Sequence, residues 1–89
     1  MPQVHFTAWL RELVPDGPLQ ADGDTVGEAL SCVFAERPQV RSYVLDDRGR
    51  LRKHVCVFAD GLRLANKAAL GHCIRPESKL HVMQALSGG

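Results

Sequence analysis

The sequence predicts an α+β fold in which a mixed sheet of four to five strands covers one face of a single amphipathic helix. Three observations support it: alternating apolar segments near both ends, one strongly helical segment between them, and turn-forming residues at the junctions. The 89-residue length fits one small domain, and 45% apolar residues are enough for one modest core. We expect a domain over residues 1–85 and a flexible tail over residues 86–89.

The first expected strand reads VHFTAWL, and it alternates with period two. One face would carry Val4, Phe6 and Ala8, and the other would carry His5, Thr7 and Trp9. The residues Pro-Asp-Gly-Pro at 15–18 are typical of a turn. A short strand over 18–21 would then complete a hairpin.

The segment TVGEALSCVFAERP is the clearest helix in the chain. Its apolar residues recur at helical spacing and form one stripe, made of Val26, Ala29, Leu30, Val33 and Phe34. Thr25 and Glu28 have the spacing of a capping box, in which each side chain accepts from the backbone N–H of the other residue. Pro38 is expected to end the helix.

The second half of the chain is predicted to be mostly strands. We expect a turn at 46–49, a strand over 51–59, a turn at Asp60-Gly61, a brief strand over 62–64, and a last strand over KLHVMQA. Residues 65–78 would form a loop or a short helical turn. Since one helix covers only one face of a sheet, the other face should be open and should carry His5, Thr7, Trp9, His54, Cys56, Phe58, His81 and Met83.

Composition argues against several function classes. Eleven Lys and Arg residues against ten Asp and Glu residues leave a net charge of +1, which favours neither a nucleic-acid nor a membrane surface. No apolar run reaches the length of a membrane-spanning helix, and the first ten residues do not resemble a signal peptide. With three cysteines, we expect reduced thiols and a cytoplasmic location.

The residues present raise two further possibilities, a metal site and a nucleophilic thiol. His54, Cys56, His72 and Cys73 are soft metal ligands, but their spacing is not that of a zinc site, so we expect no metal. Cys56 and His54 could form a thiol and base pair on one strand face, but the sequence indicates neither a third orienting group nor a pocket.

Four stretches carry a family resemblance that spans essentially the whole chain. VHFTAWLRELVP, DTVGEALSCVFAERP, GRLRKHVCVFADG and the final RPESKLHVMQALSGG resemble, in order, segments of the MoaD/ThiS-like sulfur carriers, which share the β-grasp fold of ubiquitin. The likeness includes the molybdopterin synthase small subunit and is stronger to the longer members. The chain departs from the family at 76–79, where Gly-Asp-Glu is common, and at 84–87, where the approach to the tail is often proline-rich.

The resemblance implies a carrier, not an enzyme by itself: the substrate of an adenylating enzyme, or the small subunit of a sulfur-transfer enzyme. The Gly89 carboxylate would be adenylated by a ubiquitin-activating-type enzyme, using that enzyme's ATP and Mg²⁺, and converted to a thiocarboxylate. Gly88, Ser87 and Leu86 would pass through the narrow approach to that active site. A sulfur-accepting biosynthetic enzyme of a molybdopterin, thiamine or cysteine-type pathway would receive the sulfur.

An apolar docking patch for the activating enzyme is expected around Phe58 and Met83, with His54 and His81 at its edge. The same open face would permit a weak homodimer. The plainer alternative is that these are half-covered surface residues. Two other functions stay open: a ubiquitin-like modifier joined to lysines through Gly89, and an interaction domain whose Gly-Gly end has no role.

Overall fold

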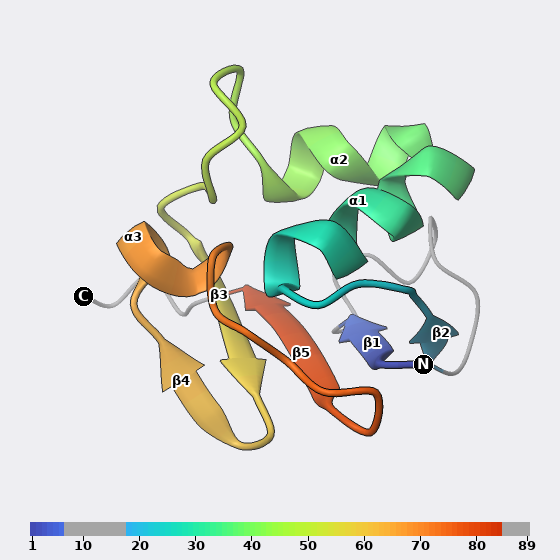
Figure 1. Ribbon diagram of the computed structural model, residues 1–89. Coiled ribbons are helices and arrows are strands. Elements are labelled where there is room, and N and C mark those ends of the chain that lie inside the picture. Colours follow the sequence, from blue (N-terminus) through green and yellow to red (C-terminus); the bar gives the residue numbers. More distant parts are fainter. Residues whose placement is uncertain (7–17, 85–89) are drawn as a thin grey trace.

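The computed structural model describes residues 1–6 and 18–84, and Figure 1 shows helix α1 lying across one face of a sheet. The described elements are β1 (Gln3–Phe6), β2 (Leu19–Gln20), α1 (Val26–Glu36), α2 (Pro38–Val44), β3 (Val55–Ala59), β4 (Leu62–Leu64), α3 (Asn66–Ala69) and β5 (Lys79–Gln84). The described strands lie in the order β2-β1-β5-β3-β4, with β1 and β5 parallel and the other neighbours antiparallel. The predicted α+β fold with a mixed sheet is confirmed. Residues 15–17 of the turn expected over 15–18 lie outside the described residues, and so do the expected strand residues Thr7, Ala8 and Trp9.

Helix α1 buries the predicted apolar stripe against the sheet. All five stripe residues are buried, and they belong to one core cluster that also includes buried side chains of β1, β3, β4 and β5, while Leu19 of β2 is partly buried against it. Full burial of a valine, leucine or phenylalanine side chain stabilises the fold by about 1.5–3 kcal/mol. The stripe therefore determines which face of the sheet is covered.

The cap of α1 is half of the box that the sequence predicts. The Glu28 amide donates to Thr25 Oγ1 at 3.2 Å, as expected. The Glu28 carboxylate, however, accepts from the Asp24 amide at 3.0 Å, one residue before the expected partner. Both bonds satisfy backbone donors that a helix start would otherwise leave unpaired.

The sequence pattern does not predict helix α2. Pro38 does end α1, since that helix stops at Glu36, but the same proline is the first residue of α2. A proline suits this position because its missing N–H would have no partner inside the helix. Val40 and Val44 lie one turn apart and are both buried in the core. Two apolar residues in a seven-residue helix give too short a pattern to be recognised in the sequence.

Strand β3 begins four residues later than predicted. Val55, Val57 and Ala59 face the core as expected, but 52–54 leave the sheet and form a turn. The Asn66 side-chain amide holds this turn, donating to the carbonyls of Arg52 at 3.3 Å and Val55 at 3.0 Å. Leu51 instead makes an isolated bridge with Leu45.

The tight turn between β3 and β4 is tied to the start of β5. Asp60 and Gly61 both have positive φ, +51° and +86°, as a two-residue hairpin turn requires. The Lys79 amide donates to the Asp60 carboxylate at 2.9 Å, and the Asp60 amide donates to the Lys79 carbonyl at 2.9 Å. The bond from the Lys79 amide is the main reason that the pKa of Asp60 is lowered, and the Ser78 hydroxyl adds to it.

We predict that Gly27→Ala destabilises the protein although it adds a better helix former. A Cβ at Gly27 would lie 2.9 Å from the Leu70 carbonyl oxygen, which already accepts from the Gly27 amide at 2.8 Å. Overpacking of this kind costs about 1–3 kcal/mol, so the free energy of unfolding should fall by about 1 kcal/mol in urea titrations. The control is Gly71→Ala, where a Cβ meets the Ala68 carbonyl oxygen at 3.9 Å. Equal or greater stability for Gly27→Ala would contradict the packing described here.

We predict that Asp60→Asn reduces the acid sensitivity of folding. The folded pKa of Asp60 lies below its unfolded value of about 3.9, so its contribution is present above that pH and is lost as pH falls through the folded pKa. Asparagine tolerates positive φ and still accepts a hydrogen bond, but it carries no charge. The variant should be less stable at pH 7 and should converge with the wild type in strong acid. Circular dichroism melts against pH test this, with the exposed Asp47→Asn as the control; parallel curves for Asp60→Asn and the wild type would refute it.

Candidate partner-binding face

The sheet face that α1 leaves uncovered is called the open face here. The register places on it the strand residues whose neighbours in sequence point into the core. These are Gln20, Gln3, His5, Cys56, Phe58, Arg63, Lys79, His81 and Met83. The face combines half-buried aromatic and thioether groups with exposed cations.

A row of π-systems crosses the middle of the open face. His5 of β1 pairs in register with His81 of β5, and their rings stack with centroids 4.5 Å apart and planes 13° from parallel. His81 lies opposite Phe58 of β3, and Phe58 lies opposite Arg63 of β4. Four adjacent strands thus each contribute one side chain to the same row.

The surroundings of His5 disfavour its protonation. The pKa of His5 is lowered, first because burial disfavours the imidazolium and then because His81 and Lys79 lie nearby. Its Nε2 is buried and has no hydrogen-bond partner among residues 1–6 and 18–84. At neutral pH the centre of the face is therefore uncharged at His5.

Met83 and Phe58 lie on the same face, as the sequence predicts, but they are diagonal neighbours. Met83 faces Cys56 directly across β3 and β5, while Phe58 faces His81. Diagonal positions on an antiparallel pair are within reach of long side chains. Phe58 and Met83 are half-buried, whereas Cys56 is buried.

His54 does not share this face. It precedes β3, in the exposed turn over 52–54, so the expected His54 and Cys56 pair on one strand face is not formed. The turn nevertheless borders the end of β5, because Val55 pairs with Gln84. His54 is therefore placed beside the point from which the tail continues.

The tail residues Leu86, Ser87, Gly88 and Gly89 lie outside the described residues, and so does the expected boundary of the domain at 85. The structure does describe β5, the strand that precedes them. Strand β5 is flanked on both sides by other strands, as Figure 1 shows, and its last residue, Gln84, pairs with Val55 of β3. The described part of the chain thus ends on the central strand of the sheet.

The other candidate groups are separate from this face. Within the described ranges, no group of three or more His, Cys, Asp or Glu side chains is arranged to hold a metal ion. His72 and Cys73 lie in the loop that pairs with the start of α1, through Val26 and Thr25. None of the described helices is long and apolar enough to cross a membrane.

Alternation in the first strand predicts that His5 lies on the open face, but it does not indicate that His5 belongs to the site. No pattern in the sequence indicates a role for Arg63. The signal for His5 lies in the parallel register of the first and last strands, which brings His5 beside His81. Arg63 belongs to a three-residue strand, too short for its face to be assigned from alternation.

Comparison with known proteins assigns the family. No family model matches the chain. The chain is 35% identical to small archaeal modifier protein 1 of Haloferax volcanii over 72 residues, which are 80% of this chain and 78% of that protein. A crystal structure of the Haloferax protein, SAMP1, superposes with a TM-score of 0.77 at 30% identity, covering 99% of this chain and 98% of that chain.

Two more distant structures support the fold alone. A chain of the BexX/CysO complex of Amycolatopsis orientalis gives a TM-score of 0.87 at 18% identity, with both chains fully covered. CysO of Mycobacterium tuberculosis gives 0.87 at 19% identity, covering 97% of this chain and all of that chain. The predicted ubiquitin-like β-grasp fold is therefore confirmed. The chain belongs with the small archaeal modifier proteins in the MoaD/ThiS-like ubiquitin-fold family, whose members are small carriers or modifiers and not catalysts themselves.

Proposed function

We propose that this protein is a sulfur carrier whose Gly89 carboxylate is activated and converted to a thiocarboxylate. The observation that carries the proposal is the Gly88-Gly89 end on a chain 35% identical to a small archaeal modifier protein. Two glycines add no side chain to the acyl carbon, so an activating enzyme can close around it from several sides. The position of β5 supports this role, because its last residue, Gln84, fixes the point in the sheet from which the five remaining residues begin.

The chemistry proceeds in two balanced steps. The Gly89 carboxylate attacks the α-phosphate of ATP, held with Mg²⁺ by the activating enzyme, and forms an acyl-adenylate while pyrophosphate leaves. Sulfide then attacks the acyl carbon, AMP leaves with the bonding electron pair, and a thiocarboxylate forms after loss of a proton. Adenylation is needed because a carboxylate repels nucleophiles and its oxygen is a poor leaving group. The thiocarboxylate would supply sulfur to a biosynthetic enzyme.

A modifier role is the second candidate, and the name of the Haloferax relative favours it. The same acyl-adenylate would serve, but the nucleophile that finally acquires the acyl group would be a lysine amine of another protein. The two functions therefore differ only after activation.

Activation is tested by intact-mass analysis after incubation with a co-encoded activating enzyme, ATP and sulfide. We predict a mass gain equal to replacing one oxygen by one sulfur, located at the C-terminal residue by fragmentation. Gly89→Val should abolish it, because a branched side chain blocks the approach to the acyl carbon, whereas Ser87→Ala should retain it. Unchanged mass together with lysine-linked conjugates in cell extract would favour the modifier. Unchanged mass without conjugates would refute both.

The open face is the proposed docking surface for the activating enzyme, with Phe58 and Met83 as its apolar anchors and His81 between β1 and β3. Aromatic and thioether side chains adapt well to a partner, and the uncharged His5 lowers the cost of covering the row. His54 would contact the enzyme at the start of the tail, where it borders Gln84 through Val55.

We predict that Phe58→Ala with Met83→Ala raises the KM for the activating enzyme by about tenfold or more while leaving kcat nearly unchanged. Neither anchor belongs to the tail over 86–89 that would enter the active site, so their loss should weaken binding and not the chemistry. Steady-state adenylation kinetics measure both constants. The matched control is Leu62→Ala, which removes a 61%-exposed apolar side chain whose strand position corresponds to the core-facing Ala59. An unchanged KM in the double variant would show that the enzyme docks elsewhere.

A further inference from the structure

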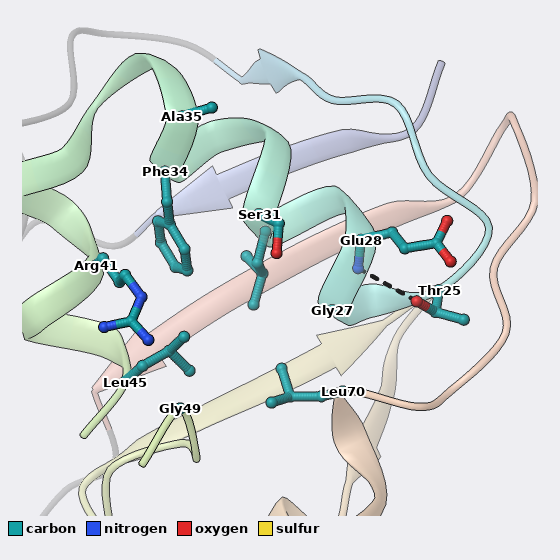
Figure 2. A pocket seen from close by; sticks show the side chains of 11 residues that line it. Thr25, Gly27, Glu28, Ser31, Phe34, Ala35, Arg41, Leu45, Gly49 and Leu70 are labelled. Atoms are coloured by element: carbon teal, nitrogen blue, oxygen red, sulfur yellow. Dashed lines mark hydrogen bonds between the residues drawn. The ribbon is translucent and has the colours of Figure 1, made fainter. Parts of the chain in front are cut away.

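The helical side of the molecule carries a hollow that the proposed function does not use. It has a volume of about 730 Å³ and lies between α1, the end of α2 and the segment after α3. Figure 2 shows Phe34, Arg41, Leu45 and Leu70 around it, with Ser31 of α1 beside them. Phe34 and Leu45 are buried members of the core, so the hollow has an apolar floor.

A second hollow adjoins the first. Its volume is about 400 Å³, and it is lined by Arg50, Leu51, Asn66, Lys67 and Leu70. Leu70 lines both hollows, and the 46–50 turn contributes Gly49 to one and Arg50 to the other. We call the two together the helix-side groove.

The charges along this groove are mostly positive. Arg41, Arg50 and Lys67 are exposed, and within the described part of the chain none of them forms an ion pair. Glu28 lines the far end, where its carboxylate accepts from the Asp24 amide. The nearby Asp46 carboxylate accepts from the amides of Arg48 and Arg50, which lowers its pKa and keeps it turned into its own loop.

The frame of the groove is held by bonds between distant segments. The Asn66 side chain ties α3 to the turn before β3, and Arg52 Nε donates to the Ser42 carbonyl of α2 at 2.7 Å. The Gly27 amide ties α1 to the Leu70 carbonyl. Both walls are therefore fixed relative to the core, so a ligand would meet a preformed surface.

We propose that the helix-side groove binds an acidic segment of a partner protein that carries apolar side chains. The apolar floor would take the aliphatic groups, and Arg41, Arg50 and Lys67 would pair with carboxylates at the rim. A nucleic acid is disfavoured, because Glu28 lines the groove and the whole chain carries a net charge of only +1.

The location gives the groove a function separate from docking on the sheet. Helix α1 separates the groove from the open face. The buried stripe of α1 packs on the face of the sheet that is opposite to the open face. A partner in the groove would therefore leave Phe58, Met83 and the end of β5 uncovered. This arrangement allows an activating enzyme and a second protein to be bound at the same time.

The test uses the full chain, labelled with ¹⁵N, and a short synthetic peptide of alternating leucine and glutamate. We expect amide shift changes at Leu51, Asn66 and Leu70 on titration, and none at Phe58 or His81. Arg50→Glu with Lys67→Glu should weaken binding by about tenfold, and added salt should weaken binding to the wild type. The matched control, Arg63→Glu with Lys79→Glu, makes the same charge change on the open face and should alter binding by less than about twofold.

Several results would overturn the inference. These are shift changes confined to the open face, equal weakening by both double variants, or preference for a peptide with lysine in place of glutamate. Tighter binding of a single-stranded RNA at the same amides would assign the groove to nucleic acid, and concentration-dependent shifts without peptide would assign it to a second copy of the chain. The titration does not involve Gly89. A negative result for the groove would therefore leave the sulfur-carrier proposal intact.

Discussion

The parallel pairing of β1 with β5 is the constraint on which the rest of the structure depends. Parallel neighbours cannot be joined by a tight turn, and here almost the whole chain lies between them. That long connection includes α1, which covers one face of the sheet. It also includes the β3-β4 hairpin, which extends the sheet on the side of β5 opposite to β1. As a result, β5 is the last described strand in sequence and the central strand of the sheet.

The same pairing creates the two distinct surfaces of the molecule. On one face it brings His5 against His81 and extends the row to Phe58 and Arg63. On the other face α1 lies against the sheet, and α1, α2, the 46–50 turn, α3 and Leu70 after it contribute the residues that line the helix-side groove. A carrier that must present its tip to one enzyme and be recognised by another protein would use both surfaces.

Local patterns in the sequence account for most of the fold. The stripe of α1 and the alternation of β5 are strong because each repeats over several residues and all the repeats are buried. The late start of β3 and the presence of α2 are missed for the same reason, because both depend on residues distant in the sequence. The alternation of β3 continues back through Leu51 and Lys53, yet Asn66, more than ten residues away, draws 52–54 into a turn. Helix α2 is similarly held by burial of Val40 and Val44 in a core that the segment itself does not reveal.

The site was predictable in part, for physical reasons of the same kind. Period-two alternation places His81, Met83 and Phe58 on one face, but the stack of His81 on His5 requires the register of two strands at opposite ends of the chain. The role of Gly89 rests on resemblance and not on a fold-level pattern. The last described strand before it is β5, whose neighbours in the sheet the sequence does not specify.

The central claim is that partners engaging the tail approach the open face and not the helical side. The most direct measurement is methyl NMR of a chain labelled at methionine and alanine methyl groups, recorded with and without the activating enzyme. Met83 lies on the open face, and the exposed Ala35 lines the helix-side groove. The account predicts that the Met83 methyl signal shifts or broadens while the Ala35 signal does not change. A perturbed Ala35 with an unchanged Met83 would contradict it.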